Sequence, residues 1–368
     1  MYLKSLELIQ FKNHEKTKLE FCPEINCFVG LNGSGKTNIL DAIHYLSLTK
    51  SAVQSSDTLN VQHEKPFFTI KGAYELSDRS LNVRCTMELG KKKMIYTDEN
   101  PVGKNSEHVG AIPLVLIAPD DTELIKGGSE GRRKFFDGMI SQLDRNYLNL
   151  LIRYHNFLKQ RNALLKQFAE SGRRDLTLLE SYDEQLIHLS IALAKRRNEL
   201  LEELAPLLQR DYEEISQGQE KVTITYETEA LREDFGDYFR SLRKRDFILK
   251  NSGAGIHKDD FNFQIEGHPI RKIGSQGQQK SFIIALKLGQ FQIFEKAKGE
   301  KPLLLLDDIF DKLDDQRIAQ MMQLISRHTF GQIFLTDARP ERSQKILSEL
   351  DSEVYFFGVE QGRVNALP

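Results

Sequence analysis

Alternation of apolar and polar positions marks the first part of the chain. It runs through residues 1–29 and returns at 68–76, 83–89 and 94–96. Successive side chains of a strand point to opposite faces, so the alternation predicts strands. We expect two or three short strands before residue 30, followed by an antiparallel meander with one solvated face.

Short continuous apolar runs follow a different pattern. Residues 114–117, 303–306 and 333–336 are apolar, or nearly so, throughout. Strands of a parallel sheet are covered on both faces, so such runs predict a buried parallel sheet. A helix is expected between the last two runs, and its apolar face would carry Ile318, Met321, Met322 and Ile325.

Between residues 147 and 200 the apolar period lengthens to about 3.5 residues, which is typical of helices. One stripe runs from Tyr147 to Phe168, interrupted by Arg161, and a second runs from Leu179 to Leu200. Residues 171–175 separate them, so two long antiparallel helices are predicted. They are either core helices of a helical subdomain or an arm reserved for a partner or DNA. Strand patterns return after Pro206, at 222–226 and 261–265.

Composition limits the possible classes of protein. The 368 residues are 40% hydrophobic and 28% charged with a net charge of −2, so any nucleic-acid binding must come from local basic patches. Cys22, Cys27 and Cys85 fit no metal-ligand spacing, which favours buried thiols in a reducing compartment. No signal-peptide pattern and no membrane-length apolar run are present, so we expect a cytoplasmic protein without membrane contact.

A glycine-rich segment lies between an apolar run and a helical pattern. It fits the phosphate-loop template of a glycine, four free positions and then Gly-Lys-Thr. Glycines let backbone N–H groups turn inward around anionic oxygens, and the following helix directs its positive end at them. The predicted nucleotide-binding residues are Gly30, Leu31, Asn32, Gly33, Ser34, Gly35, Lys36 and Thr37.

Two adjacent carboxylates follow the apolar run at 303–306. Open α/β sheets bind ligands at the carboxyl ends of their strands, which places Asp307 and Asp308 near the phosphate loop. We predict that Asp307 and Thr37 hold Mg²⁺, and that Asp308 and Lys36 are catalytic, Asp308 acting on the attacking water and Lys36 on the phosphates. The acidic character continues in Asp311, Asp314 and Asp315.

A second glycine-bearing turn, at 274–280, precedes another helical pattern. Alone it fits a plain helix N-cap. Because it stands just before the carboxylate strand, it also resembles the signature motif of ABC-type ATPases. That resemblance implies that Ser275, Gly277 and Gln278 close over the γ-phosphate of ATP bound to a second subunit.

The whole chain resembles the RecF family of recombination and repair ATPases, which is related to SMC-type heads. The resemblance rests on the phosphate loop, the signature turn and the carboxylate strand, together with residues 11–13, 118–121, 132–137 and 255–260. The gap from Lys36 to Ser275 is 275 − 36 = 239 residues, too short for a long SMC coiled coil.

The resemblance implies an α/β fold of the ABC-type ATPase head, with a mixed sheet, an antiparallel meander and an inserted helical-hairpin lobe. The expected domains are a head part at 1–140, the helical lobe at 141–217 and a second head part at 218–368. It also implies ATP and Mg²⁺ as cofactors, an ATP-dependent homodimer, and slow hydrolysis used as a timer. The expected partners are duplex DNA near single-strand gaps, bound without sequence preference, and mediators of the RecO and RecR type that assist recombinase loading.

The chain departs from the family pattern at several positions. Lys280 and Ser281 replace the usual Arg-Thr, and Asp337 stands where many ABC proteins have histidine. No glutamine of the Gln-loop is evident, and Asp120 or Asp121 is the candidate for its place.

Four basic clusters are candidates for DNA contact, with an ordinary solvated surface as the alternative for each. They lie at 91–93, 132–134, 195–197 and 243–245. Two other functions remain possible: a short ABC-like ATPase acting as an assembly scaffold, and a metabolic phosphate-loop kinase. An ATPase-gated nuclease is disfavoured because only 368 − 308 = 60 residues follow Asp308.

Overall fold

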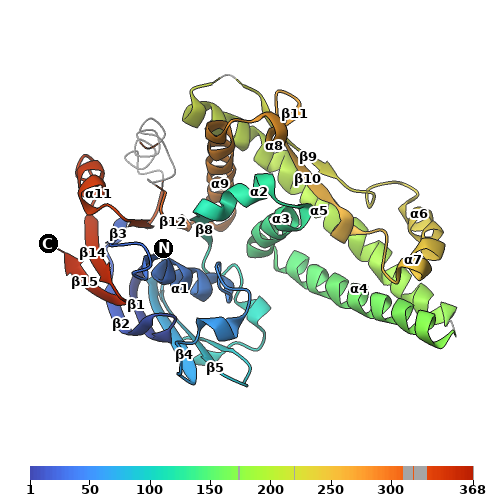
Figure 1. Cartoon of the computed structure of the whole chain (residues 1–368), viewed down its shortest axis with the longest axis horizontal. Coiled ribbons are helices and arrows are strands. Elements are labelled where there is room, and N and C mark those ends of the chain that lie inside the picture. Colours follow the sequence, from blue (N-terminus) through green and yellow to red (C-terminus); the bar gives the residue numbers. More distant parts are fainter. Residues whose placement is uncertain (173–174, 219, 310–317, 319–329, 368) are drawn as a thin grey trace. The chain divides into compact units, whose positions relative to one another are not determined.

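The computed structural model describes residues 1–172, 175–218, 220–309, 318 and 330–367 (Figure 1). The chain forms two compact units, which we call the sheet unit and the helical unit. The sheet unit contains Met1–Thr122, Arg210–Gly218 and Gln276–Pro368, and the helical unit contains Glu123–Gln209 and Gln219–Ser275. Each unit is therefore assembled from segments that are far apart in the sequence.

The first sheet of the sheet unit is antiparallel, with six strands in the order β2-β1-β4-β5-β6-β7. In β5, Leu81, Val83, Cys85 and Met87 are buried, and the residues between them are exposed or half-buried. The predicted N-terminal strands and meander are confirmed. The strands are β1 (Tyr2–Phe11), β2 (His14–Glu20), β4 (Phe67–Glu75), β5 (Ser80–Glu88), β6 (Met94–Thr97) and β7 (Asn100–Pro101).

The second sheet of this unit is mixed, in the order β15-β14-β3-β13-β12-β8. All neighbours are parallel except β14 and β15, which form an antiparallel hairpin. Every residue of β3, β12 and β13 is buried, which explains their continuous apolar runs. The strands are β3 (Ile25–Val29), β8 (Leu114–Ile117), β12 (Leu303–Leu306), β13 (Ile333–Asp337), β14 (Val354–Glu360) and β15 (Arg363–Leu367).

The predicted connection between β12 and β13 cannot be compared residue by residue. β13 lies between β12 and β3, as expected for a strand beside the phosphate-loop strand. Ile318 is described and buried, but the rest of the predicted helix lies outside the described residues, as do the carboxylates that extend the acidic cluster. These undescribed positions are Met321, Met322, Ile325, Asp311, Asp314 and Asp315.

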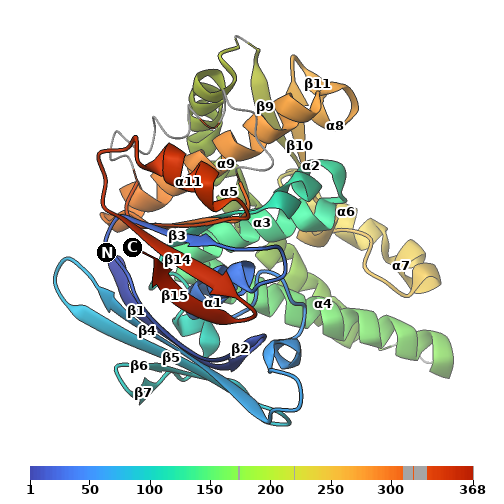
Figure 2. The same cartoon turned by 60° about the vertical axis from the view of Figure 1, so that its left-hand side comes forward.

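Helix α1 (Lys36–Leu48) is the centre of the sheet unit. It packs against β4 and β5 of the antiparallel sheet and against β8 and β13 of the mixed sheet, and Figure 2 shows it between the two. Side chains from both sheets and from α1 form one hydrophobic core. The other helices of the unit are α9 (Gln276–Lys298), which packs on β8, α11 (Pro340–Leu347), and 3-10 turns at Asp57–Asn60, Asn105–Glu107 and Pro119–Thr122. The three cysteines are free and buried, as predicted.

The helical unit combines helices with a small antiparallel sheet in the order β11-β10-β9. The strands are β9 (Val222–Glu227), β10 (Asp260–Ile265) and β11 (His268–Pro269). The helices are α2 (Glu123–Lys126), α3 (Ser129–Leu143), α4 (Arg145–Ser171), α5 (Leu176–Ser216), α6 (Phe235–Ser241), α7 (Arg243–Leu249) and α8 (Ile270–Ile273), with a 3-10 turn at Ile256–Lys258. The part of α5 from Arg210 onward belongs to the sheet unit. Within the described residues, no helix is both long and apolar enough to cross a membrane.

The predicted pair of long helices is confirmed as α4 and α5. They run antiparallel, because Arg153 of α4 bonds Gln185 of α5 while Arg161, further along α4, pairs with Asp183, which comes earlier in α5. Gly172 ends α4 in the left-handed conformation, with φ 70°. The predicted break at 171–175 is therefore a glycine-terminated helix end.

Two residues that interrupt the helical pattern, Pro206 and Arg161, are accommodated within the long helices. Helix α5 continues through Pro206 to Ser216, because Leu204, Leu208 and Tyr212 keep the buried stripe intact and their burial offsets the backbone hydrogen bond that a proline removes. Arg161, which interrupts the first stripe, is fully buried. It pairs with two buried carboxylates rather than with solvent.

The two units also divide the chain differently from the expected domains. Residues 123–140 and 219–275 belong to the helical unit rather than to the head segments. One reason is local packing: Phe136 of α3 stacks on Phe261 of β10 with ring centroids 3.9 Å apart. Periodicity locates the strand near 261, but it carries no information about which sheet the strand joins.

Candidate nucleotide-binding site

The glycine-rich segment forms a turn between β3 and α1, the setting that its template requires. Gly30 and Gly35 have φ values of 154° and 118°, which side chains rarely adopt. A Cβ on Gly30 would lie 2.2 Å from the Val359 carbonyl oxygen, and one on Gly35 would lie 2.6 Å from the Asn13 amide. The backbone at these two positions therefore has room only for glycine.

Lys36 is the first residue of α1, and its side chain folds back into the loop. Its Nζ donates to the carbonyl oxygens of Gly30 at 2.6 Å and Leu31 at 3.0 Å. The side chain is buried, so its charge is held inside the curve of the loop. An anion that enters this curve meets both the ammonium group and the positive end of α1.

The turn between β1 and β2 supports the loop from outside. Asn13 donates through Nδ2 to Ser34 O at 2.9 Å and accepts through Oδ1 from Asn38 Nδ2 at 2.8 Å. These bonds connect one turn residue to the loop and to the first turn of α1. Sequence reasoning included Asn13 in the family resemblance but missed this role, because the partners lie 21 and 25 residues away.

His14 connects the same turn to the far end of the chain. Its ring nitrogens lie 3.1 Å from Gly35 O and 2.8 Å from Gly362 O, in the turn between β14 and β15. Gly362 in turn donates its N–H to Ser34 O at 2.8 Å. Burial lowers the pKa of His14, while its contacts with the Gly35 and Gly362 carbonyl oxygens oppose that fall. Three segments, the β1–β2 turn, the phosphate loop and the β14–β15 turn, thus form one hydrogen-bonded cluster.

Thr37 and Asp307, predicted as metal ligands, lie next to each other. Thr37 Oγ1 donates to Asp307 Oδ1 at 2.9 Å, and Thr336 Oγ1 donates to the same oxygen at 2.8 Å. Burial raises the pKa of Asp307 above its ordinary value, while both hydroxyls and the charge of Lys36 oppose the rise. The sequence prediction missed Thr336, which stands at the end of the neighbouring strand β13.

The hydroxyl and carboxylate oxygens at this position fit a hard cation such as Mg²⁺, which takes few protein ligands and keeps phosphate and water oxygens. In the described part of the chain there is no group of three or more His, Cys, Asp or Glu side chains that could hold a metal. Thr37 and Asp307 are the two predicted metal ligands, and the structure brings them within hydrogen-bond distance of each other.

Asp308 has a left-handed backbone, with φ 46°. Its N–H donates to Thr336 Oγ1 at 2.8 Å, so the same hydroxyl holds Asp307 and fixes the backbone of Asp308. A left-handed conformation outside glycine costs about 1–2 kcal/mol and occurs often at functional sites. The two adjacent carboxylates are therefore held in different backbone conformations and can serve different roles.

Asp120 and Asp121, the two candidates for the Gln-loop position, differ in whether their side chains already have partners within the protein. Asp121 pairs with Lys287 at 2.8 Å and accepts from Ala118 N at 2.7 Å, so it is committed to local structure. Asp120 is exposed, and its charge helps to raise the pKa of Asp307. Of the two candidates for the Gln-loop position, Asp120 is therefore the better one.

The side chain of Asp337, which stands at the switch position, is held by residues that follow it in the chain. It is fully buried and accepts hydrogen bonds from the Arg339 N–H, from Arg342 and from Ser343. These partners lie just before and within α11. The side chain of Asp337 therefore fixes the start of that helix, while its backbone carbonyl oxygen accepts from the Gly30 N–H of the phosphate loop at 3.3 Å.

The signature turn has the predicted local form. Gly274 ends α8, and α9 begins at Gln276, with Gly277 and Gln278 in its first turn. Ser275 is the last residue of the helical unit, and Gly277 and Gln278 belong to the sheet unit. The assignment of these three residues to a nucleotide site remains a prediction from the sequence.

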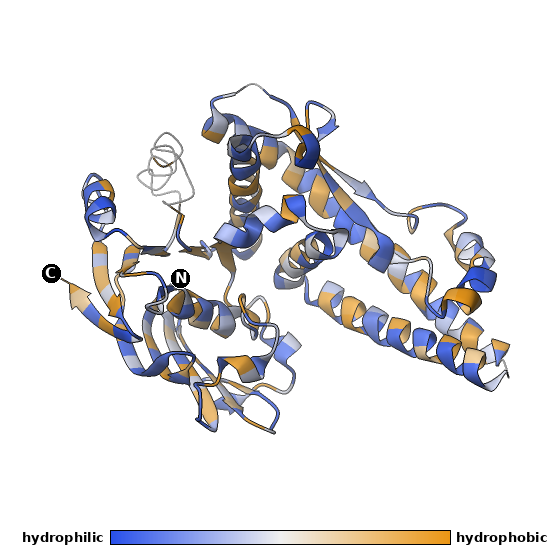
Figure 3. Cartoon of the chain, in the orientation of Figure 1, coloured by the Kyte–Doolittle hydropathy of each residue, from blue (hydrophilic) through white to orange (hydrophobic). Residues whose placement is uncertain are grey.

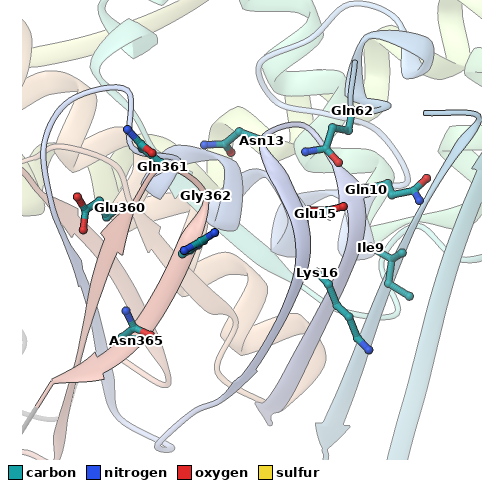
Figure 4. A pocket seen from close by; sticks show the side chains of 11 residues that line it. Ile9, Gln10, Asn13, Glu15, Lys16, Gln62, Glu360, Gln361, Gly362 and Asn365 are labelled. Carbon is teal, nitrogen blue, oxygen red and sulfur yellow. The ribbon is translucent and has the colours of Figure 1, made fainter. Parts of the chain in front are cut away.

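A cavity of about 890 Å³ opens beside the β1–β2 and β14–β15 turns (Figure 4). Five amide side chains line it: Gln10, Asn13, Gln62, Gln361 and Asn365. The amide oxygens of Gln10 and Gln62 are buried and have no hydrogen-bond partner in the described residues. A second cavity, of about 550 Å³, is lined by Gly30–Ser34 itself. The polar groups of the first cavity suit a ligand that carries N–H or O–H donors.

The basic clusters predicted to contact DNA are partly committed to internal ion pairs. Arg197 is buried and pairs with Asp137 and Asp259, and Arg132 forms two bonds to Asp260. Such arginines cannot reach a phosphate without leaving their partners, which corrects the prediction for them. Lys93 pairs with Asp57, and Arg243 pairs with Asp183 and Glu180. The exposed members are Lys91, Lys92, Lys134, Lys195, Lys244 and Arg245.

Comparisons with known proteins agree with this geometry. Residues 2–362 match the family model described as RecF/RecN/SMC N terminal domain. The DNA replication and repair protein RecF of Cytophaga hutchinsonii is 42% identical over 368 residues, which cover 100% of this chain and 97% of the relative.

Solved structures give the same result and confirm the predicted fold class. Two are described as the recombination mediator protein RecF-ATPrS and RecF-ATP in the RecFOR pathway, with TM-scores of 0.90 and 0.89 and identities of 32% and 31%. Both alignments cover 100% of this chain and 98% of the other.

Proposed function

We propose that this chain, which belongs to the RecF family of DNA replication and repair proteins, is an ATP-dependent recombination mediator that binds duplex DNA. Its predicted action is to dimerise on ATP, to grip DNA at single-strand gaps and to assist recombinase loading together with RecO- and RecR-type partners. The RecFOR pathway named for the solved relatives supports this assignment.

One observation carries the nucleotide part of the proposal. Thr37, from the phosphate-loop helix, and Thr336, from β13, both donate to the same oxygen of Asp307, at 2.9 and 2.8 Å. A carboxylate placed beside a phosphate loop in this way is the arrangement that phosphate-loop ATPases use to hold a magnesium nucleotide. When bound, Mg²⁺ would neutralise charge that develops on the β- and γ-phosphates.

The phosphate loop and Asp308 have different roles in the proposed reaction. The inward N–H groups of 30–37 and the Lys36 ammonium group would bind the phosphates. Asp308 would orient the attacking water and accept its proton. An aspartate reaches the water less well than a glutamate would, so we expect slow hydrolysis that serves as a timer.

Dimerisation is the proposed output of binding. Ser275, Gly277 and Gln278 of one subunit would cover the γ-phosphate held by the other, so that two nucleotides join two weak faces. Hydrolysis would remove this bridge and open the dimer. The exposed basic residues outside α7, which are Lys91, Lys92, Lys134 and Lys195, would contact DNA phosphates. This predicts affinity that falls steeply with salt and shows little dependence on sequence.

Sedimentation velocity with and without ATP, Mg²⁺ and a short duplex tests the proposal directly. We expect the full chain to dimerise only with nucleotide, and Ser275→Arg to prevent dimerisation while leaving nucleotide binding intact. Asp308→Asn should keep the ATP-dependent dimer and stop turnover. A Ser275→Arg chain that still dimerises, or a monomer that hydrolyses ATP at the wild-type rate, would support a kinase-like enzyme instead.

A further inference from the structure

The outward side of α7 combines cationic side chains with large apolar ones. Ile248 and Leu249 are 78% and 55% exposed, and Lys244 and Arg245, one turn earlier, are exposed as well. Residues four apart in a helix lie on the same side, so these four residues form one continuous surface, which we call the tip face. Figure 3 shows α7 changing from hydrophilic to hydrophobic along its length.

The opposite side of α7 is fixed within the helical unit. Arg243 Nε lies 2.7 Å from Asp183 Oδ2, and the buried Asp246 lies 2.8 Å from Arg161 Nη1. Phe247 packs against the hydrophobic cluster formed by α4 and α5. The apolar residues of the tip face therefore cannot rotate inward unless these buried ion pairs break, which is costly.

Helix α5 extends the apolar surface at the edge of α7. Glu180 of α5 lies 3.3 Å from Arg243, and Leu176 stands one turn before Glu180 on the same side of the helix. Leu176 is 56% exposed. Three large aliphatic side chains thus reach solvent at the same end of the helical unit.

The chemistry of the tip face favours a protein partner over nucleic acid. Protein interfaces place apolar groups at the centre and charged groups at the rim, whereas a DNA backbone offers charge and little apolar surface to cover Ile248 and Leu249. The single carboxylate of α7, Asp246, is buried in its ion pair. The exposed charge of this helix is therefore entirely positive, which calls for acidic groups on the partner.

We propose that the tip face docks a segment of a partner protein in which acidic side chains flank large apolar ones. Ile248 and Leu249 bury the apolar side chains of that segment, and Lys244 and Arg245 pair with its carboxylates. This inference goes beyond the proposed function and does not depend on it, because no residue of the tip face belongs to the nucleotide site.

Peptide selection on the full chain tests the partner chemistry. A random displayed peptide library is selected on the wild-type protein and counter-selected on the variant Lys244→Glu/Arg245→Glu/Ile248→Ser/Leu249→Ser. We expect the recovered peptides to be enriched in Asp and Glu beside Leu, Ile, Phe or Trp. Recovery of basic or neutral peptides, or no enrichment over the counter-selected variant, overturns the proposal.

A labelled recovered peptide then measures each contribution by fluorescence anisotropy. Ile248→Ser/Leu249→Ser and Lys244→Glu/Arg245→Glu should each weaken binding by about tenfold or more, which corresponds to about 1.4 kcal/mol. The control Val53→Ser/Leu59→Ser removes similarly exposed aliphatic groups from the sheet unit, at 56% and 58% exposure, and should change affinity less than twofold. An equal effect of the control overturns the proposal.

Two further outcomes identify a different occupant. If Lys244→Glu/Arg245→Glu weakens binding of a short duplex while Ile248→Ser/Leu249→Ser changes neither duplex nor peptide binding, the tip face is a DNA surface. If Ile248→Ser/Leu249→Ser abolishes self-association in sedimentation velocity without any peptide, the occupant is a second copy of this chain. Either result overturns the proposal. Unchanged thermal unfolding of the variants ensures that they are folded.

Discussion

The carbonyl oxygen of Asn13 lies 2.1 Å from the position that a Cβ would take on Gly362. These residues belong to the first and last hairpins of the chain, and between them the N–H of Gly362 bonds the Ser34 carbonyl in the phosphate loop. A side chain at position 362 would therefore displace the β1–β2 turn that supports the phosphate loop, although position 362 is far from that loop in the sequence.

Gly362→Ala should weaken nucleotide binding by about tenfold or more, since a displacement of about 1 Å in a positioned site can cost about 100-fold. Titration with a fluorescent ATP analogue measures the effect. Gly90→Ala is the matched control, because Gly90 has the same φ of 79° but nothing within 4 Å of its Cβ position. Both variants carry the same backbone strain, so equal affinities would show that the contact with Asn13 is unimportant.

Thr336→Val tests the residue that sequence reasoning missed. Valine keeps the shape of the side chain but removes the hydroxyl that donates to Asp307 and accepts from Asp308. Losing such an outer-shell partner typically costs about 10- to 100-fold in metal affinity or activity, so we expect the Mg²⁺ requirement for ATP turnover to rise in that range. Thr69→Val, which removes a buried hydroxyl from the antiparallel sheet, should leave the requirement unchanged.

Arg161→Met should destabilise the helical unit strongly. Both carboxylates that pair with Arg161, Asp183 and Asp246, are buried, and the variant leaves them without that partner. Removing one member of a buried ion pair typically costs about 3–5 kcal/mol. Chemical denaturation followed by circular dichroism measures the change.

Arg232→Met is the comparison for Arg161→Met, because Arg232 also pairs with two carboxylates but is 44% exposed on its side chain. Exposed pairs are worth about 1 kcal/mol or less. If Arg161→Met lowered the unfolding free energy by no more than Arg232→Met does, the buried ion pairs would add little to stability.

His257 should make the helical unit acid-sensitive. Its Nε2 donates to Ser252 O at 3.1 Å and its Nδ1 accepts from the Tyr154 hydroxyl at 2.6 Å, an arrangement that a neutral ring satisfies. Burial lowers the pKa of His257 from 6.5 to about 4. The unfolded chain therefore takes up a proton first as the pH falls, and stability decreases between pH 6.5 and 4 by about 1.4 kcal/mol per pH unit.

Unfolding free energies at several pH values compare wild type with His257→Gln, which keeps a donor and an acceptor but does not titrate. The unfolding free energy of the variant should decrease less steeply as the pH falls through this range. The difference in slope between the two proteins should correspond to about one bound proton. Parallel pH dependences for the two proteins would contradict the assignment of the lowered pKa to His257.

Elements of the fold and of the site differ in how far the sequence could predict them. β12, α1 and the alternating strand β5 were predicted because periodicity reports burial. The turn around Gly30 and the proximity of Thr37 to Asp307 were predicted because a motif encodes a local backbone shape and its ligands.

Periodicity does not encode partners that are distant in the sequence. It could not show that Asn13 and His14 hold the phosphate loop, nor that Thr336 orients Asp307. The basic cluster around Arg197 looked like a surface patch because the carboxylates that pair with Arg197 lie 60 and 62 residues away. Periodicity also could not show that α5 passes through Pro206, because the burial that offsets the missing hydrogen bond comes from the tertiary fold.

The position of β3 has a consequence for the order in which the protein is made. Its two neighbours in the sheet are β13 and β14, which begin at Ile333 and Val354. A chain emerging from the ribosome therefore contains the complete phosphate-loop motif long before the strand that anchors it has a partner. Such a chain must remain open through most of translation, because its long-range pairings come last. The strand that carries the phosphate loop thus gains its sheet neighbours only near the end of synthesis.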